Sequence, residues 1–139
     1  MSTELPPIIT WNDDWLIGQE EIDLHHKTLV DMIQTLFGAL ITTQGKDYIN
    51  KVFVELVEYT KYHFKREEEL FEEHGFDQLE RQKNLHQTLV TDLLGISQTI
   101  IAHGSSEETS EEVYDFLKHW LIDHIIEEDL KFKVFLAGK

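Results

Sequence analysis

Proline occurs only near the beginning of this 139-residue chain, and its absence elsewhere constrains the fold more than any other feature. The two prolines are Pro6 and Pro7, so that after a short N-terminal arm no position forbids a helix. Glycine supplies the breaks, because Gly45, Gly75 and Gly104 each follow a long stretch with helical periodicity, where a helix-ending glycine is expected. The sequence therefore predicts an arm over residues 1–17 and four helices, which cover residues 19–43, 47–73, 77–103 and 107–136.

Four long helices joined by short connections favour one architecture. Each predicted helix has about 25 residues and a length of about 38 Å. Short connections force consecutive helices to run antiparallel, so we expect an all-α, up-down-up-down four-helix bundle in a single domain over residues 1–139. A coiled-coil oligomer is the structural alternative, but the apolar faces are wide and rich in Phe, Trp and Leu, as in globular bundles.

The composition argues against several classes of function. The chain has no cysteine, which excludes disulfides, iron–sulfur clusters and thiolate ligands. Its formal net charge is -15, so we expect neither nucleic acid nor a membrane as a partner. The sequence also shows no signal-peptide pattern and no apolar run of about 18 residues. We therefore expect a cytoplasmic protein, and a monomer, because no second apolar face is visible.

Polar residues interrupt the apolar stripe of every predicted helix. In chain order these residues are His26, His63, Glu67, Gln82, His86, His124 and Glu128. One histidine on such a stripe is more often a hydrogen-bonded core residue than a ligand. However, His26 and His63 lie at similar distances from the connection between their helices, and the other neighbouring pairs agree in the same way. The inward polar groups are therefore expected to converge on one layer, whereas His74, His103 and His119 are expected to be solvated or capping.

The types of residue in this layer limit the choice of metal. Imidazole and carboxylate groups without sulfur suit iron, manganese or zinc. A lone zinc ion needs only three or four ligands, whereas this layer offers enough candidates for two ions bridged by carboxylates. Ferritin-like di-iron proteins use paired Glu-x-x-His motifs, and no histidine here has a glutamate three residues before it. A histidine-rich iron pair is also less suited to high-valent oxidation, which favours reversible binding.

Four segments resemble the motifs of the hemerythrin and bacteriohemerythrin family, in register and across nearly the whole chain: IGQEEIDLHHKTL, HFKREEEL, QKNLH and WLIDHIIEED. The resemblance implies two iron ions with a bridging oxo or hydroxo group, and dioxygen as the ligand. Carried over position by position, it implies that the first iron is held by His26 and His63, the second by His86 and His124, and that Glu67 and Asp129 are the bridges. It further implies an apolar wall of the oxygen pocket that consists of Leu29, Trp120, Leu121 and Ile125.

Two positions depart from the family pattern. Gln82 stands where the family has a histidine, and His25 stands where the family has a glutamine. The third ligand of the second iron is therefore open. Gln82 could coordinate through its amide oxygen, a water could fill the place, or Gln82 could be a buried amide that never touches metal. His25 could partly compensate, although it lies near the edge of the stripe.

The regular helix and the resemblance disagree about the last carboxylate. Glu128 shares the inner face with His124, whereas Asp129 is rotated by about 140° from that histidine. A π-bulge near Ile126 would turn Asp129 inward, and such bulges favour functional sites. We therefore predict a bulge there, with Asp129 rather than Glu128 at the metals.

These observations favour reversible dioxygen binding at a non-haem di-iron centre, in an oxygen carrier, an oxygen store or a scavenger. The main alternative is a di-iron enzyme that acts on peroxide, nitric oxide or dioxygen, because a centre weakened at one metal could turn a ligand over. A further alternative is an oxygen-sensing or redox-sensing iron module. We expect a binding protein rather than an enzyme, and assign no catalytic residue.

Overall fold

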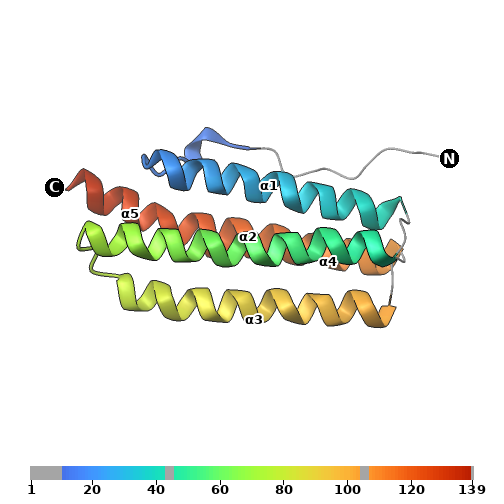
Figure 1. Cartoon of the computed structure of the whole chain (residues 1–139). Helices are drawn as coiled ribbons and strands as arrows, with labels where there is room; N and C mark the ends of the chain where they lie inside the picture. Colours follow the sequence, from blue (N-terminus) through green and yellow to red (C-terminus); the bar gives the residue numbers. More distant parts are fainter. Residues whose placement is uncertain (1–10, 43–45, 104–106, 139) are drawn as a thin grey trace.

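The chain folds into a bundle of four helical rods that alternate in direction (Figure 1). The computed structural model describes residues 11–42, 46–103 and 107–138. The first three rods are α1 (Glu20–Ile41), α2 (Lys46–Glu73) and α3 (Leu79–His103). The fourth runs without a break through α4 (Glu107–His119), a π-helical segment η2 (Trp120–Ile126) and α5 (Glu127–Ala137). No strand occurs among the described residues, and the predicted all-α, antiparallel bundle is confirmed.

The break between α2 and α3 explains why α3 begins two residues after its predicted start. Gly75 has a φ of 68°, and the backbone N–H of Phe76 donates to the carbonyl oxygen of Phe71 at 2.9 Å, as in a Schellman motif. Phe76 turns inward and packs on the ring of Phe71. This inward turn delays the next helix, so that α3 begins at Leu79 rather than at residue 77. The other two predicted breaks lie outside the described residues: Gly45 and Gly104.

Two apolar clusters fill the interior and leave a gap between them. The larger cluster includes Leu29 of α1 and Phe64 of α2, whereas the smaller one includes Ile22 of α1 and Leu70 of α2. On each helix the residues between these positions are therefore enclosed by apolar groups on both sides. His26 of α1 and Glu67 of α2 fall into this gap.

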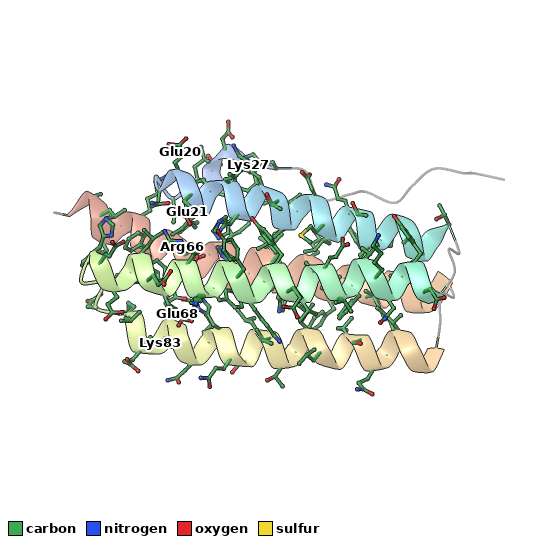
Figure 2. The ribbon with its side chains drawn as sticks, in the orientation of Figure 1. Glu20, Glu21, Lys27, Arg66, Glu68 and Lys83 are labelled. Atoms are coloured by element: carbon green, nitrogen blue, oxygen red, sulfur yellow. The ribbon has the colours of Figure 1, made fainter. Side chains whose placement is uncertain are left out.

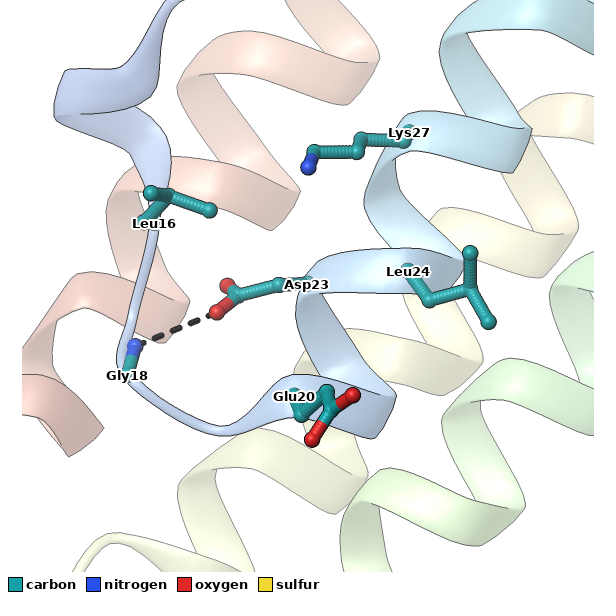
Figure 3. A pocket seen from close by; sticks show the side chains of 6 residues that line it. All are labelled: Leu16, Gly18, Glu20, Asp23, Leu24 and Lys27. Carbon is teal, nitrogen blue, oxygen red and sulfur yellow. Dashed lines mark hydrogen bonds between the residues drawn. The ribbon is translucent and has the colours of Figure 1, made fainter.

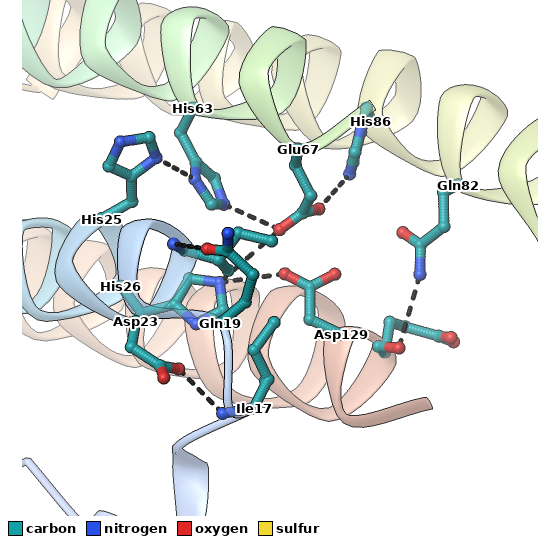
Figure 4. A network of polar contacts seen from close by, with 12 residues as sticks. Ile17, Gln19, Asp23, His25, His26, His63, Glu67, Gln82, His86 and Asp129 are labelled. Carbon is teal, nitrogen blue, oxygen red and sulfur yellow. Dashed lines mark hydrogen bonds and ion pairs between the residues drawn. The ribbon is translucent and has the colours of Figure 1, made fainter. Parts of the chain in front are cut away.

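The arm before α1 is fastened to the bundle through Asp23. This arm contains a short 3-10 turn, η1 (Asp13–Trp15). The Asp23 carboxylate accepts hydrogen bonds from the backbone N–H groups of Gly18, at 3.3 Å (Figure 3), and Ile17, at 2.7 Å (Figure 4). Gly18 has a φ of 86°, which suits glycine, and Ile17 is buried in the smaller cluster. The described part of the predicted arm is thus held at this end of the bundle by Asp23, which lies three residues before His26.

Charged side chains on the outside link neighbouring helices. The Arg66 guanidinium on α2 donates to both carboxylate oxygens of Glu21 on α1, at 2.6 and 2.8 Å, and also to Glu69 (Figure 2). The two-pronged contact fixes Glu21 more firmly than a single hydrogen bond would. Among the described residues, no helix combines the length and the apolar character that crossing a membrane requires.

Candidate metal centre

A layer of buried polar side chains crosses the bundle between the two apolar clusters (Figure 4). Its members come from α1, α2, α3 and α5, and none is more than 5% exposed: His25, His26, His63, Glu67, Gln82, His86 and Asp129. Burying so many polar groups is unfavourable unless they bind one another or an ion. The predicted convergence is thus seen for His26, His63, Glu67, Gln82 and His86, whereas the side chain of the predicted member His124 lies outside the described part of the chain.

Four of these residues bring their ligand atoms close together. His63 and Glu67 lie one turn apart on α2, and Nε2 of His63 is 3.2 Å from Oε2 of Glu67. From α1, Nε2 of His26 lies 3.8 Å from the same oxygen and 2.9 Å from Oδ2 of Asp129. One ligand atom from each of these four side chains lies within 4.8 Å of the others. Two imidazoles and two carboxylates at this spacing could hold a metal ion.

Glu67 also reaches the opposite side of the layer. Its second carboxylate oxygen, Oε1, lies 3.0 Å from Nε2 of His86 on α3. The two oxygens of one carboxylate therefore face two different groups of histidines. A glutamate in this position has the geometry to bridge two metal positions, one on the α1–α2 side and one on the α3 side.

The π-helical segment decides which acidic residue of the last rod faces the layer. The backbone N–H of Glu127 donates to the carbonyl oxygen of Ile122, five residues earlier, which inserts one extra residue into the turn. As a result Asp129 is 1% exposed. Glu128 points outward, where Arg81 donates two hydrogen bonds to its carboxylate, at 2.5 and 2.8 Å. The predicted bulge and the inward turn of Asp129 are confirmed, while its role as a bridging ligand stays a prediction.

His86 is held from behind by a carboxylate that the sequence analysis missed. Oε2 of Glu68 lies 2.7 Å from Nδ1 of His86, and the imidazole stacks on the ring of Phe64 at a centroid distance of 3.9 Å. Histidine ligands of metals commonly donate their second ring N–H to a carboxylate in this way. Glu68 belongs to an acidic run that resembles a solvated helix face, so the sequence carried little signal for this contact.

Gln82 occupies the layer beside His86 with its amide in a defined orientation. The Nε2 group donates to the backbone oxygen of Glu128 at 3.4 Å. A carbonyl oxygen only accepts hydrogen bonds, so this contact fixes which end of the amide is nitrogen. The other end, Oε1, is buried without a hydrogen-bond partner. An amide oxygen held in this way is available to a cation.

His25 does not compensate for Gln82 in the way considered from the sequence. Its Nδ1 atom lies 2.9 Å from Nδ1 of His63, so it stands behind that candidate ligand and outside the four-residue cluster. Among the histidines expected to be solvated or capping, Nδ1 of His74 lies 2.8 Å from the carbonyl oxygen of Leu70, and the exposed His119 pairs with Asp123. The side chain of His103 lies outside the described part of the chain.

The shifted pKa values of the side chains in this layer favour a bound cation. Burial lowers the pKa of His63 to about 4, so its imidazole is neutral at neutral pH. Burial alone would raise the pKa of Glu67, but His63, Asp129 and His26 outweigh it, and the pKa lies well below its ordinary value. Burial and the neighbouring Glu67 charge raise the pKa of Asp129 well above its ordinary value. The charge of Glu67 thus opposes the ionisation of Asp129, and a cation between the two carboxyl groups would remove that opposition.

The unpartnered atoms of the layer fit such a cation. Four buried atoms here have no hydrogen-bond partner: Nδ1 of His26, Nε2 of His63, Oε2 of Glu67 and Oε1 of Gln82. The two oxygens are lone-pair donors, Nε2 of His63 is one when its ring proton is on Nδ1, and native proteins rarely leave such groups unsatisfied. Nitrogen and oxygen donors without sulfur suit iron, manganese or zinc, so the residues fit the metals expected from the sequence.

Apolar side chains border the layer on the side of the larger cluster. Leu29, Trp120 and Leu121, all expected in the wall of an oxygen pocket, belong to this cluster and are at most 1% exposed. The indole N–H of Trp120 donates to the carbonyl oxygen of Leu89 at 3.0 Å, which fixes the ring. Two other predicted site residues have side chains outside the described part of the chain: the ligand His124 and the pocket residue Ile125.

Comparison with known proteins points to one family. Residues 17–136 match the family described as the hemerythrin HHE cation binding domain. A bacteriohemerythrin of Pseudomonas paraeruginosa is 33% identical over 123 residues, which are 87% of this chain and 76% of that protein. A bacteriohemerythrin of Stenotrophomonas maltophilia is 30% identical over 88% of this chain and 77% of its own length. A hemerythrin-like protein of Naegleria gruberi is 29% identical over 96% of this chain and 98% of its own.

Proposed function

The chain belongs to the hemerythrin family, and on that premise we propose that its buried layer holds a non-haem di-iron centre that binds dioxygen reversibly. The observation that carries the proposal is the position of Glu67. One of its oxygens faces His63 and the other faces His86, an arrangement that supports a single carboxylate serving two metal positions. A site for one ion would not need donors on both sides of this residue.

The ligands divide between the two positions according to the helices that supply them. We assign His26 and His63 to the first iron, His86 and His124 to the second, and Glu67 and Asp129 to both, together with a bridging oxo or hydroxo group. Gln82 supplies its amide oxygen to the second iron. The iron pair supplies the electron exchange that holds dioxygen reversibly, a chemistry that protein side chains lack.

The chain's own residues keep water and competing reactions out. Leu29, Trp120 and Leu121 are fully packed on one side of the layer, and they have no free polar group, because the indole N–H is bound to Leu89. Such a wall lowers the local dielectric and limits the entry of protons, which would otherwise promote irreversible oxidation of the iron. The neutral His63 and the ionised Glu67 already have the protonation states that metal binding requires.

We further propose that the protein works as a monomer in the cytoplasm, with dioxygen as its ligand, as a carrier, store or scavenger. A chain without cysteine is compatible with a reducing compartment.

Anaerobic loading with ferrous iron tests the proposal directly. We expect two irons per chain and a visible absorption that appears under air, bleaches on deoxygenation and returns with oxygen. A colourless protein that takes up a single zinc ion and no iron pair would contradict the di-iron assignment. Net consumption of dioxygen, peroxide or nitric oxide with a product that accumulates over many turnovers would favour an enzyme instead.

A further inference from the structure

His25 makes a contact that its expected role, partial compensation for the missing histidine ligand, does not explain. It is 5% exposed, although it lies at the edge of the α1 stripe, and its Nδ1 atom is 2.9 Å from Nδ1 of His63 (Figure 4). At this distance one nitrogen must donate a proton and the other must accept it. The direction of this hydrogen bond determines which nitrogen of His63 is left for a metal.

The far side of His25 indicates the direction. Nε2 of His25 lies 3.8 Å from Oε2 of Glu21, and Arg66 holds this carboxylate with two hydrogen bonds (Figure 2). A fixed negative charge near Nε2 favours the tautomer of neutral His25 that carries its proton there. Nδ1 of His25 is then a lone pair, so the shared proton belongs to Nδ1 of His63.

The contacts of His63 on the side that faces the layer support the same direction of this hydrogen bond. Its Nε2 atom faces Oε2 of Glu67 at 3.2 Å, and both atoms are buried without a hydrogen-bond partner. A lone pair on Nε2 accounts for that absence, because two acceptors that face each other cannot form a hydrogen bond. When Nε2 binds a metal it carries no proton, so Nδ1 must donate, and His25 is the neighbour in position to accept.

We propose that His25 is a positioning residue that accepts a hydrogen bond from Nδ1 of His63 and so presents the Nε2 lone pair of His63 to the first metal position. Glu21, held by Arg66, orients His25 in turn. The inference rests on the proposed function for the identity of the metal, but its hydrogen-bond direction is a property of the chain itself.

Two readouts test the role, and one of them needs no metal. In the full-length metal-free protein, nitrogen-15 spectra of the imidazoles should show His63 protonated at Nδ1 and His25 protonated at Nε2. In the iron-loaded protein, loss of iron to a ferrous chelator should be about 10- to 100-fold faster in His25→Leu, the range for loss of a partner behind a metal ligand. His25→Gln offers an amide oxygen as a replacement acceptor and should keep the rate within about threefold of the parent.

A matched control separates the hydrogen bond from packing. The ring of Tyr62 also contacts His25, at a centroid distance of 5.3 Å, but Tyr62 is half exposed and forms no described contact with His63. Tyr62→Leu should therefore leave the rate of iron loss unchanged. Glu21→Gln should shift the His25 proton towards Nδ1 and speed iron loss less than His25→Leu does.

Specific outcomes would overturn the role of His25. They are a parent protein with the proton of His63 on Nε2 and that of His25 on Nδ1, or a His25→Leu variant that keeps iron as long as the parent. Equal losses in His25→Leu and His25→Gln would also refute the acceptor role. A parent that binds iron but not dioxygen would refute the proposed function alone, since the proton positions and the rates of iron loss would still decide the role of His25.

Discussion

The two halves of the polar layer hold their histidines in different ways. On the α1–α2 side, His63 is backed by the neutral imidazole of His25, and both candidate ligands there are 0% exposed. On the α3 side, His86 is backed by the carboxylate of Glu68, and the neighbouring Gln82 offers only an amide oxygen. In the α1–α2 half, the candidate ligands His26 and His63 are imidazoles, and the group behind His63 is neutral. In the α3 half, the amide oxygen of Gln82 is a weaker donor than imidazole, and the group behind His86 is a carboxylate.

The strength of a metal ligand depends on the residue behind it as well as on its own type. Nδ1 of His86 faces Oε2 of Glu68, and the hydrogen bonds to Glu67 and Glu68 outweigh burial and raise the pKa of His86. A carboxylate behind an imidazole makes it a stronger metal ligand. We expect Glu68 to offset part of what the second half loses through Gln82. The variants below break or sharpen this comparison, beginning with the residue that serves both halves.

Glu67→Gln should have the largest effect, because it removes the charge that both halves share. We expect iron affinity in both positions to fall by more than the roughly 10- to 100-fold that loss of an outer partner produces. The metal-free protein should also lose stability, because the lowered pKa of Glu67 means that the fold favours its charged form, and the amide removes that charge from its histidine partners. Iron content per chain and thermal unfolding in the presence of a chelator measure the two effects separately.

The exposed Glu69 provides a matched control on the same helix. Glu69→Gln changes the same atoms two residues away and should leave iron content unchanged, because Glu69 is exposed and its ion pair within the described residues is with Arg66 on the surface. If Glu67→Gln still bound two irons as tightly as the parent, then Glu67 would not be a bridge, and the division of the layer into two metal positions would be wrong.

Much of this arrangement follows from sequence periodicity. His26, His63, Glu67, Gln82 and His86 were predicted to face one layer because each interrupts an apolar stripe, and all are buried there. The helix ends were also predicted to within two residues of the observed bounds. These features depend on the regular geometry of helices, which the order of residues determines directly.

Other features depend on geometry that periodicity does not encode. A regular helix would place Glu128 inward, and only the extra residue in the π-helical segment brings Asp129 to the layer, so the resemblance rather than the pattern identified it. Glu68 and His25 lie off the inner stripes, and their roles depend on how closely neighbouring helices approach. The late start of α3 likewise results from the burial of Phe76, a tertiary contact.

Asp129→Asn should have the next largest effect, because Asp129 connects the last rod to the α1–α2 half through His26. We expect iron affinity to fall within the roughly 10- to 100-fold range, since the amide keeps one oxygen but loses the charge. Equilibrium iron binding against a competing chelator measures the loss. The free energy of unfolding of the metal-free form should change little, because burial already favours the uncharged carboxyl group of Asp129.

Glu128→Gln is the control for Asp129, since the two residues are neighbours that the π-helical segment turns in opposite directions. The hydrogen bonds from Arg81 lower the pKa of Glu128 to about 2. Partial burial opposes this shift, and Lys131 supports it. The variant therefore removes a charged contact near the surface. The free energy of unfolding should fall by less than about 1 kcal/mol, with iron retained. The reverse pattern, with iron lost only in Glu128→Gln, would refute the inward role of Asp129.

Substitutions at Gln82 should have the smallest effects, and they test the weaker half of the layer most directly. Gln82→His replaces a neutral oxygen donor by imidazole at a position that is 0% exposed and lies one turn before His86 on α3. Iron held beside this residue should be released more slowly, by a factor of less than about 10. This effect is smaller than that of losing a residue that hydrogen-bonds a metal ligand, since Glu67, Asp129 and Glu68 are unchanged. Autoxidation of the oxygenated protein should also slow.

Gln82→Ala distinguishes an amide ligand from a water ligand. If Oε1 of Gln82 binds the metal, as its lack of a hydrogen-bond partner indicates, the alanine variant should release iron faster than the parent. If water occupies that coordination position instead, the rate should stay the same in Gln82→Ala and still fall in Gln82→His. Should both variants match the parent in iron content, release rate and dioxygen binding, Gln82 is a core amide that donates to the backbone of Glu128. The difference between the two halves would then lie in the partners of His63 and His86 alone.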